Sequence, residues 1–118
     1  MAEKPSNHIL VDISAIQQRL AEYAWEPLSP GVELSRIYQD EVGNIKIALL
    51  RYVPGARVPE HLHTGMEYIH ILAGSQQDER GVYQAGTLLV SLPGSRHSVV
   101  SPEGCVVLAI WESPVQFV

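Results

Sequence analysis

Several features that mark whole classes of protein are rare in this sequence or absent from it. Cys105 is the only cysteine among 118 residues, so the chain forms no internal disulfide and gains nothing from an oxidising compartment. The longest apolar run, Cys105 to Trp111, is far shorter than the roughly 18 residues that cross a bilayer. Residues 1–8 are polar and do not begin a signal peptide. We therefore expect a cytoplasmic protein.

Positive charge is also scarce. Eight Lys and Arg stand against thirteen Asp and Glu, which gives a net charge of −5 with neutral histidines. Such a balance repels a phosphate backbone or an anionic lipid surface, so we expect neither nucleic acid nor membrane as a partner. Apolar residues make up 46% of the chain and the mean hydropathy is +0.03, which favours one compact folded domain over disorder.

Turn-forming residues, by contrast, are plentiful. Nine glycines and eight prolines divide most of the chain into short segments, which is typical of an all-β domain. Two segments on either side of a polar turn at residues 40–44 predict a hairpin. Roughly nine or ten strands are expected, as a sandwich or a small barrel requires. The predicted strands cover residues 9–13, 32–38, 45–53, 58–63, 66–73, 81–85, 87–92, 97–101 and 105–112.

One segment near the start has helical rather than strand character. Ser14 and Gln17 have the spacing of a capping box, in which two side chains satisfy the first backbone N–H groups of a helix. Apolar residues follow at helical spacing, which predicts one short helix over about residues 15–23. We expect this helix to cover the end of a sheet.

Four of the five histidines lie between residues 61 and 97. His61 and His63 are two apart, so on a strand both side chains leave the same face and can share one ion. Glu67 begins the next strand, and a Pro-Gly turn can deliver His97 to the same place. The alternative is a set of buried polar residues satisfied by hydrogen bonds, but a buried carboxylate among imidazoles is costly without a cation. Three imidazoles and one carboxylate suit zinc or iron(II), and also manganese, nickel or copper.

These residues resemble the first motif of the cupin superfamily at every anchor position, in the pattern Gly55-x5-His61-x-His63-x3-Glu67-x6-Gly74. The resemblance implies an all-β double-stranded β-helix, the cupin jelly-roll barrel, with one short N-terminal helix. It also implies one divalent transition metal ion inside the barrel. The ligands that it implies are His61, His63, Glu67 and His97.

The second cupin motif is matched with two departures. The spacings of Gly86, Gly94 and His97 hold, but Leu92 stands where the family usually has proline and Ser101 where it usually has asparagine. Residues 45–112 further resemble the cupin domain of ChrR-type anti-sigma factors. We expect residues 1–8 to form a flexible tail and residues 9–118 a single cupin domain. Residues 1–44 contain no cysteine for a separate zinc site, so sigma-factor binding is not expected.

Other residues with reactive or ligand-forming side chains are given structural roles. By strand parity His70 lies on the face opposite to Glu67, so we expect it to pack against the other sheet or a partner subunit. Cys105 begins an apolar strand and is expected to be an inert core thiol. Arg96, beside a turn, is expected to be solvated. No catalytic residue is assigned. Three aromatic residues could line a pocket but receive no catalytic role: Tyr52, Tyr83 and Trp111.

Two functional classes differ in how many coordination positions of the metal ion stay free for other ligands. Six-coordinate iron(II) with four protein ligands leaves two positions, which suits a dioxygenase or related oxidative enzyme acting on a small organic molecule. Four-coordinate zinc is closed by the same ligands, which suits a non-catalytic sensory or ligand-binding cupin of the ChrR type. Metal-independent isomerisation is less favoured because the ligand set is intact. A small-molecule ligand and a homodimer are the expected partners, with residues 9–13 adding to the edge of a partner's sheet.

Overall fold

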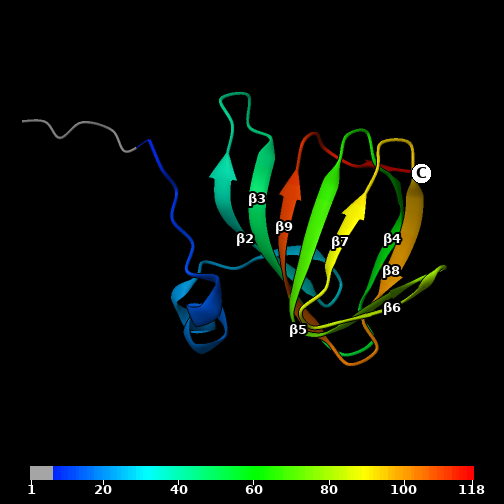
Figure 1. Ribbon diagram of the computed structural model, residues 1–118, viewed down its shortest axis with the longest axis horizontal. Coiled ribbons are helices and arrows are strands. Elements are labelled where there is room, and N and C mark those ends of the chain that lie inside the picture. Colours follow the sequence, from blue (N-terminus) through cyan, green and yellow to red (C-terminus); the bar gives the residue numbers. More distant parts are fainter. Residues whose placement is uncertain (1–6) are drawn as a thin grey trace, which may run out of the picture.

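The computed structural model describes residues 7–118 and shows ten antiparallel strands with one short helix (Figure 1). The helix is of the 3-10 type and is labelled η1. The elements are η1 (Ile13–Glu22), β1 (Glu26–Ser29), β2 (Val32–Gln39), β3 (Ile45–Tyr52), β4 (Arg57–Leu62), β5 (Glu67–Asp78), β6 (Gly81–Gln84), β7 (Leu88–Ser91), β8 (Arg96–Val100), β9 (Cys105–Trp111) and β10 (Gln116–Phe117).

A single curled sheet makes both walls of the barrel. Its strand order is β1-β2-β3-β9-β5-β8-β4-β10, with β6 and β7 also paired to β5. The long strand β5 belongs to both walls, because its first half pairs with β7 and β9 and its second half with β6 and β8. At the crossing point Gly74 has φ +74° and its Cα lies against the Gly104 carbonyl, where a Cβ atom would come within 1.9 Å. The result is the all-β jelly roll expected from the sequence.

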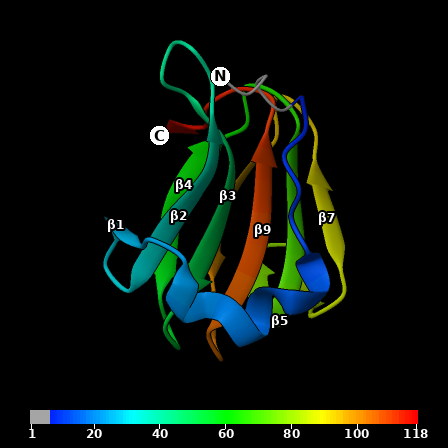
Figure 2. The ribbon, with the colours of Figure 1, turned by 90° about the vertical axis from the view of Figure 1, so that its left-hand side faces the viewer.

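Side-chain alternation divides the apolar residues into two clusters. The larger cluster fills the barrel and includes Leu50, Ile71 and Val107. The smaller cluster lies on the outer face of β3 and β9, where Ile16 of η1 packs against Leu49 and its neighbours. In Figure 2 the helix crosses this outer face of the strands. The helix therefore covers a face of the sheet and not only its end.

The strand predictions agree with the structure except near the termini. The hairpin of β2 and β3 and the strands β4 to β9 lie where they were predicted, although β5 continues to Asp78. The predicted strand over residues 9–13 is wrong, because residues 9–12 are in no strand and Ile13 begins η1. The short strands β1 and β10 were not predicted. They bear few buried apolar side chains, so they lack the alternation that reveals a strand.

The predicted capping box is also wrong. Asp12 occupies the N-cap position and makes no side-chain cap hydrogen bond, while the Ser14 hydroxyl donates to the Asp12 carboxylate at 2.7 Å. Ser14 thus hydrogen-bonds a side chain, not a backbone N–H group. The tail predicted over residues 1–8 falls mostly on residues 1–6, which lie outside the described residues. None of the helices in the described part of the chain has the length and apolar character needed to cross a membrane.

Candidate metal centre

The structure brings the four predicted ligands together inside one end of the barrel. His61 lies on β4 directly opposite His97 on β8, His63 follows the end of β4, and Glu67 begins β5. All four are buried, and their potential ligand atoms lie within 4.8 Å of one another. This is close to the separation available to two ligands of one ion, each about 2.1 Å from it.

Backbone bonds and a register shift explain this convergence. The pairing of β4 with β8 shifts between Val58 and His61, so that both side chains face the interior although they are three residues apart. The N–H of His63 donates to the Ser95 carbonyl at 2.9 Å, and Gly94 N–H donates to the His63 carbonyl at 2.8 Å. These bonds hold the end of β4 against the turn that precedes β8.

Each imidazole has its Nδ1 atom beside an oxygen acceptor. His61 Nδ1 lies 2.9 Å from the Pro59 carbonyl, His63 Nδ1 lies 2.9 Å from Ser95 Oγ, and His97 Nδ1 lies 3.0 Å from Asp78 Oδ2. In a neutral ring that donates from Nδ1, the lone pair is on Nε2. This outer layer of acceptors is the arrangement that orients histidines toward a metal.

Inside this layer the hydrogen bonding of the polar atoms is incomplete. Glu67 Oε1 lies 3.1 Å from His63 Nε2 and 3.9 Å from His97 Nε2. Among the buried side-chain nitrogen and oxygen atoms of residues 7–118, His97 Nε2 is the one with no hydrogen-bond partner. A cation between these atoms would accept the lone pair of His97 and offset the charge of Glu67. The donor set therefore fits a divalent transition metal ion.

The pKa shifts favour metal binding at His61 and Glu67, whereas a metal ion would have to displace a proton from His63. Burial holds the pKa of His61 below its ordinary value, so this ring is neutral at neutral pH. Burial lowers the pKa of His63 too, but the Glu67 carboxylate outweighs it and the pKa lies above its ordinary value. Burial raises the pKa of Glu67, yet hydrogen bonds from His63 and from Trp111 Nε1, 2.8 Å from Oε2, bring it below its ordinary value. The carboxylate is thus ionised and held in place.

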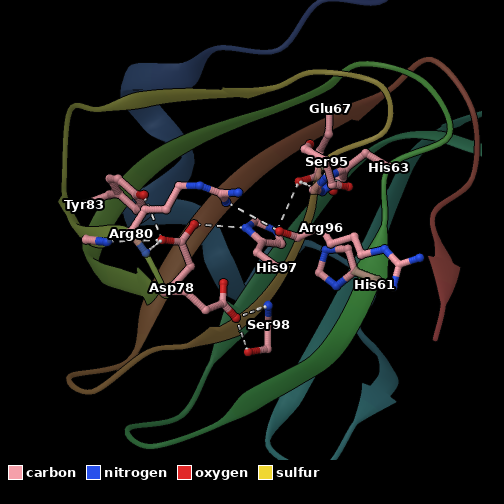
Figure 3. A network of polar contacts seen from close by, with 12 residues as sticks. His61, His63, Glu67, Asp78, Arg80, Tyr83, Ser95, Arg96, His97 and Ser98 are labelled. Atoms are coloured by element: carbon pink, nitrogen blue, oxygen red, sulfur yellow. Dashed lines mark hydrogen bonds and ion pairs between the residues drawn. The ribbon is translucent and has the colours of Figure 1, made fainter.

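Asp78 anchors His97 from outside the ligand cluster. Its side chain is only 4% exposed, and Oδ2 accepts from His97 Nδ1 while Oδ1 accepts from the Tyr83 hydroxyl at 2.8 Å (Figure 3). The backbone N–H groups of Arg80 and Gly81 donate to the same Oδ1 at 2.8 and 3.2 Å. This role of Asp78 could not be predicted from the sequence, because nothing in linear spacing links it to His97.

A cavity of about 300 Å³ adjoins the cluster inside the barrel. His61, Glu67 and His97 form part of its wall, and most other lining residues are apolar. Tyr52 and Trp111, two of the aromatic residues that could line a pocket, do line it, together with the buried amide side chain of Gln76. Tyr83 instead donates to Asp78. Three residues of the C-terminal segment also line the cavity: Pro114, Val115 and Phe117.

The remaining predictions for single residues agree with the structure, except for the packing of His70. His70 is half-buried on the face of β5 opposite to Glu67 and is not part of the ligand cluster, but it lies in register with Leu108 of the outer cluster and not against the other wall. Cys105 is buried, and burial raises the pKa of its thiol. Arg96 is exposed beside the turn.

Comparison with known proteins agrees with the resemblance to ChrR-type cupins that the sequence shows. The ChrR cupin-like domain family matches residues 14–116. The chain belongs to this family. The anti-sigma-E factor ChrR of Cereibacter sphaeroides is 30% identical over 105 residues, which cover 86% of this chain and 48% of ChrR. This cupin-like chain therefore spans about half of the length of its curated relative.

Solved structures share the fold. The chain resembles the anti-sigma factor ChrR in the crystal structure of its complex with SigE from Rhodobacter sphaeroides, with a TM-score of 0.71 and 27% identity over 84% of this chain and 54% of that one. It also resembles a proposed acetylacetone dioxygenase from Methylibium petroleiphilum PM1, with a TM-score of 0.78 and 16% identity over 100% of this chain and 85% of that one. At this identity the second likeness concerns the fold alone.

Proposed function

We propose that this cupin binds one divalent transition metal ion, zinc or iron(II) before manganese, nickel or copper, through His61, His63, Glu67 and His97. The observation that carries the proposal is the buried Nε2 atom of His97, which lacks a partner beside the ionised Glu67. An unpaired buried acceptor next to a buried carboxylate is costly, and one cation relieves both. The metal would act as a Lewis acid and, if iron(II), would bind dioxygen.

We further propose an oxidative reaction, dioxygenase-like, on a small organic molecule in the adjoining cavity. The cavity opens onto His61, Glu67 and His97, so a bound molecule would lie beside the metal position. In a dioxygenation, dioxygen is the oxidant and both of its atoms enter the substrate, so no separate reductant is needed. The chain's own part is to hold the ligands, with Asp78 and Trp111 fixing His97 and Glu67, and to exclude water with apolar walls.

A non-catalytic zinc-binding sensory or ligand-binding role is the second candidate. It is favoured by the 30% identity to an anti-sigma factor, because that relative is a regulator and not an enzyme by its name. In this case zinc would be held by the same four residues with no position for dioxygen.

Metal analysis and oxygen uptake separate the two. Protein purified without added metal is analysed for metal content, then stripped, loaded anaerobically with iron(II) and mixed with a panel of small organic molecules. Oxygen consumption that depends on one of these molecules, with both labelled oxygen atoms in the product, supports the enzyme. Stoichiometric zinc in the purified protein, and no oxygen consumption by the iron-loaded form, supports the sensor. No bound metal and no effect of a chelator on the melting temperature contradict both.

We also propose that two copies of the chain pair. Leu88, Val90 and Ile110 are 58%, 40% and 38% exposed, and Val90 and Ile110 lie on either side of Tyr68 in register across β7, β5 and β9. Among the described strands β7 pairs only with β5, which leaves one sheet edge open. Size-exclusion chromatography with light scattering should give the dimer mass, and Val90→Lys should give the monomer. A cytoplasmic location stays a prediction from the single cysteine.

A further inference from the structure

The cavity beside the metal cluster has an unusual distribution of polar groups. Its wall is apolar over most of its extent, with residues such as Leu34, Ile69 and Val99. Apart from the ligand cluster, the buried polar side chains that line it are Tyr52 and Gln76, which are 7% and 3% exposed. No lysine or arginine lines it within residues 7–118. The half-buried side chain of Asn44 also lines the cavity, so the fully buried polar groups of the wall are the ligand cluster and one second group.

The Tyr52–Gln76 pair comes from the two halves of the barrel wall. Tyr52 ends β3, and Gln76 lies in the second half of β5, where its amide also donates weakly to the Cys105 sulfur at 3.8 Å. Burial raises the pKa of the Tyr52 hydroxyl far above its ordinary value, so this group stays protonated and can donate a hydrogen bond. The pair therefore offers a neutral donor and acceptor and no charge.

The size of the cavity limits its occupant to a small molecule. A volume of about 300 Å³ is at the lower end of the range for ligand pockets. An apolar cavity of about half that volume holds a benzene molecule. One ring with two short substituents is therefore the scale of molecule that fits.

We infer that the cavity binds an uncharged, mainly apolar molecule with an oxygen atom at one end for the metal and a second hydroxyl or carbonyl group for Tyr52 and Gln76. Sugars are excluded because the apolar walls would leave most of their hydroxyl groups unpaired. Small dicarboxylates are excluded because no cationic side chain faces the second carboxylate. This inference rests on the proposed metal site and adds the chemical class of its ligand.

The test uses the full chain loaded with iron(II) under anaerobic conditions, because six-coordinate iron(II) keeps two positions free, and isothermal titration calorimetry without oxygen. The probes are 4-hydroxyacetophenone and 4-methylacetophenone, which have nearly the same shape but differ in the second polar group. We expect the hydroxyl compound to bind about tenfold more tightly, as one hydrogen bond within the protein implies. D-ribose and succinate serve as comparison probes and should bind more weakly than either ketone.

The variant Tyr52→Phe completes a double-mutant cycle. It should remove the difference between the two ketones, while its iron content and melting temperature show that the fold and the metal site are kept. Equal binding of the two ketones to the unaltered protein would overturn the inference, and so would tighter binding of ribose or succinate. If iron(II) is retained and no ketone binds, the ligand class is wrong but the metal site stands. If iron(II) is not retained, the proposed function itself fails.

Discussion

Replacing Asp78 by asparagine tests the link between the outer hydrogen bonds and the metal site. The carboxylate accepts from His97 on one oxygen and from Arg80, Gly81 and Tyr83 on the other. In Asp78→Asn the amide oxygen can keep the three donors on its side, which places the NH₂ group against His97 Nδ1. The NH₂ group then donates to Nδ1, and the ring proton moves to Nε2, the atom that a metal would need.

The expected loss of metal affinity follows from this exchange of an acceptor for a donor beside His97. Removing an outer partner of a metal-bound histidine typically lowers metal affinity by about 10- to 100-fold, or roughly 1.4 to 2.7 kcal/mol. Asp78 should lie toward the upper end, because the side chain is 4% exposed and water cannot easily replace the lost acceptor. The exchange also favours the wrong tautomer of His97, the effect that inactivates a triad when its Asp becomes Asn.

The assay is competition for zinc with a coloured chelator at pH 7.5, on protein stripped and reloaded. Glu79→Gln is the matched control, because Glu79 is the adjacent acidic residue and hydrogen-bonds Ser98 instead of a ligand. It should leave zinc affinity unchanged. Melting temperatures of the metal-free proteins separate a folding defect from a site defect. Unchanged zinc affinity in folded Asp78→Asn would refute the role of Asp78.

Three further predictions concern other parts of the structure. Because burial raises the pKa of the Cys105 thiol, Ellman's reagent at pH 8 should label it only slowly until guanidinium unfolds the chain; rapid labelling of native protein would contradict its burial. Gly74→Ala should cost roughly 3 kcal/mol or more of unfolding free energy, since its Cβ would meet a carbonyl oxygen. Gly86→Ala, which also has a positive φ but open space around the Cβ position, should cost about 1 kcal/mol. Equal losses in chemical denaturation would refute this. Trp111→Phe removes a donor to Glu67 and should weaken zinc binding about tenfold by the same competition assay, and an unchanged affinity would show that the bond is dispensable.

The ligand cluster could be predicted from the sequence because its signals are local. His61 and His63 alternate along one strand, and turns bring Glu67 and His97 to the same end of the barrel. Strand parity was also enough to place His70 on the opposite face. In each case the two-residue period of a strand determines which side chains share a face.

Long-range contacts and short strands could not be predicted in the same way. The contact between Asp78 and His97 depends on β5 extending past Ala73 into the second wall, whereas the strand predicted from the sequence ends at Ala73. The cavity depends on how ten strands curl around it, which no local pattern contains. Ser14 is the opposite case, because a local pattern was present but misleading. Its spacing from Gln17 fits a capping box, yet its hydroxyl donates a hydrogen bond to the Asp12 side chain.

Metal content shows without an intermediate step whether these four residues hold one metal ion. Protein purified without added metal is analysed by inductively coupled plasma mass spectrometry, beside His97→Ala and the control His70→Ala. We expect one transition metal ion per chain in the unaltered protein and in His70→Ala, and a large loss in His97→Ala. The absence of bound metal from the folded, unaltered protein, or full retention in His97→Ala, would contradict it.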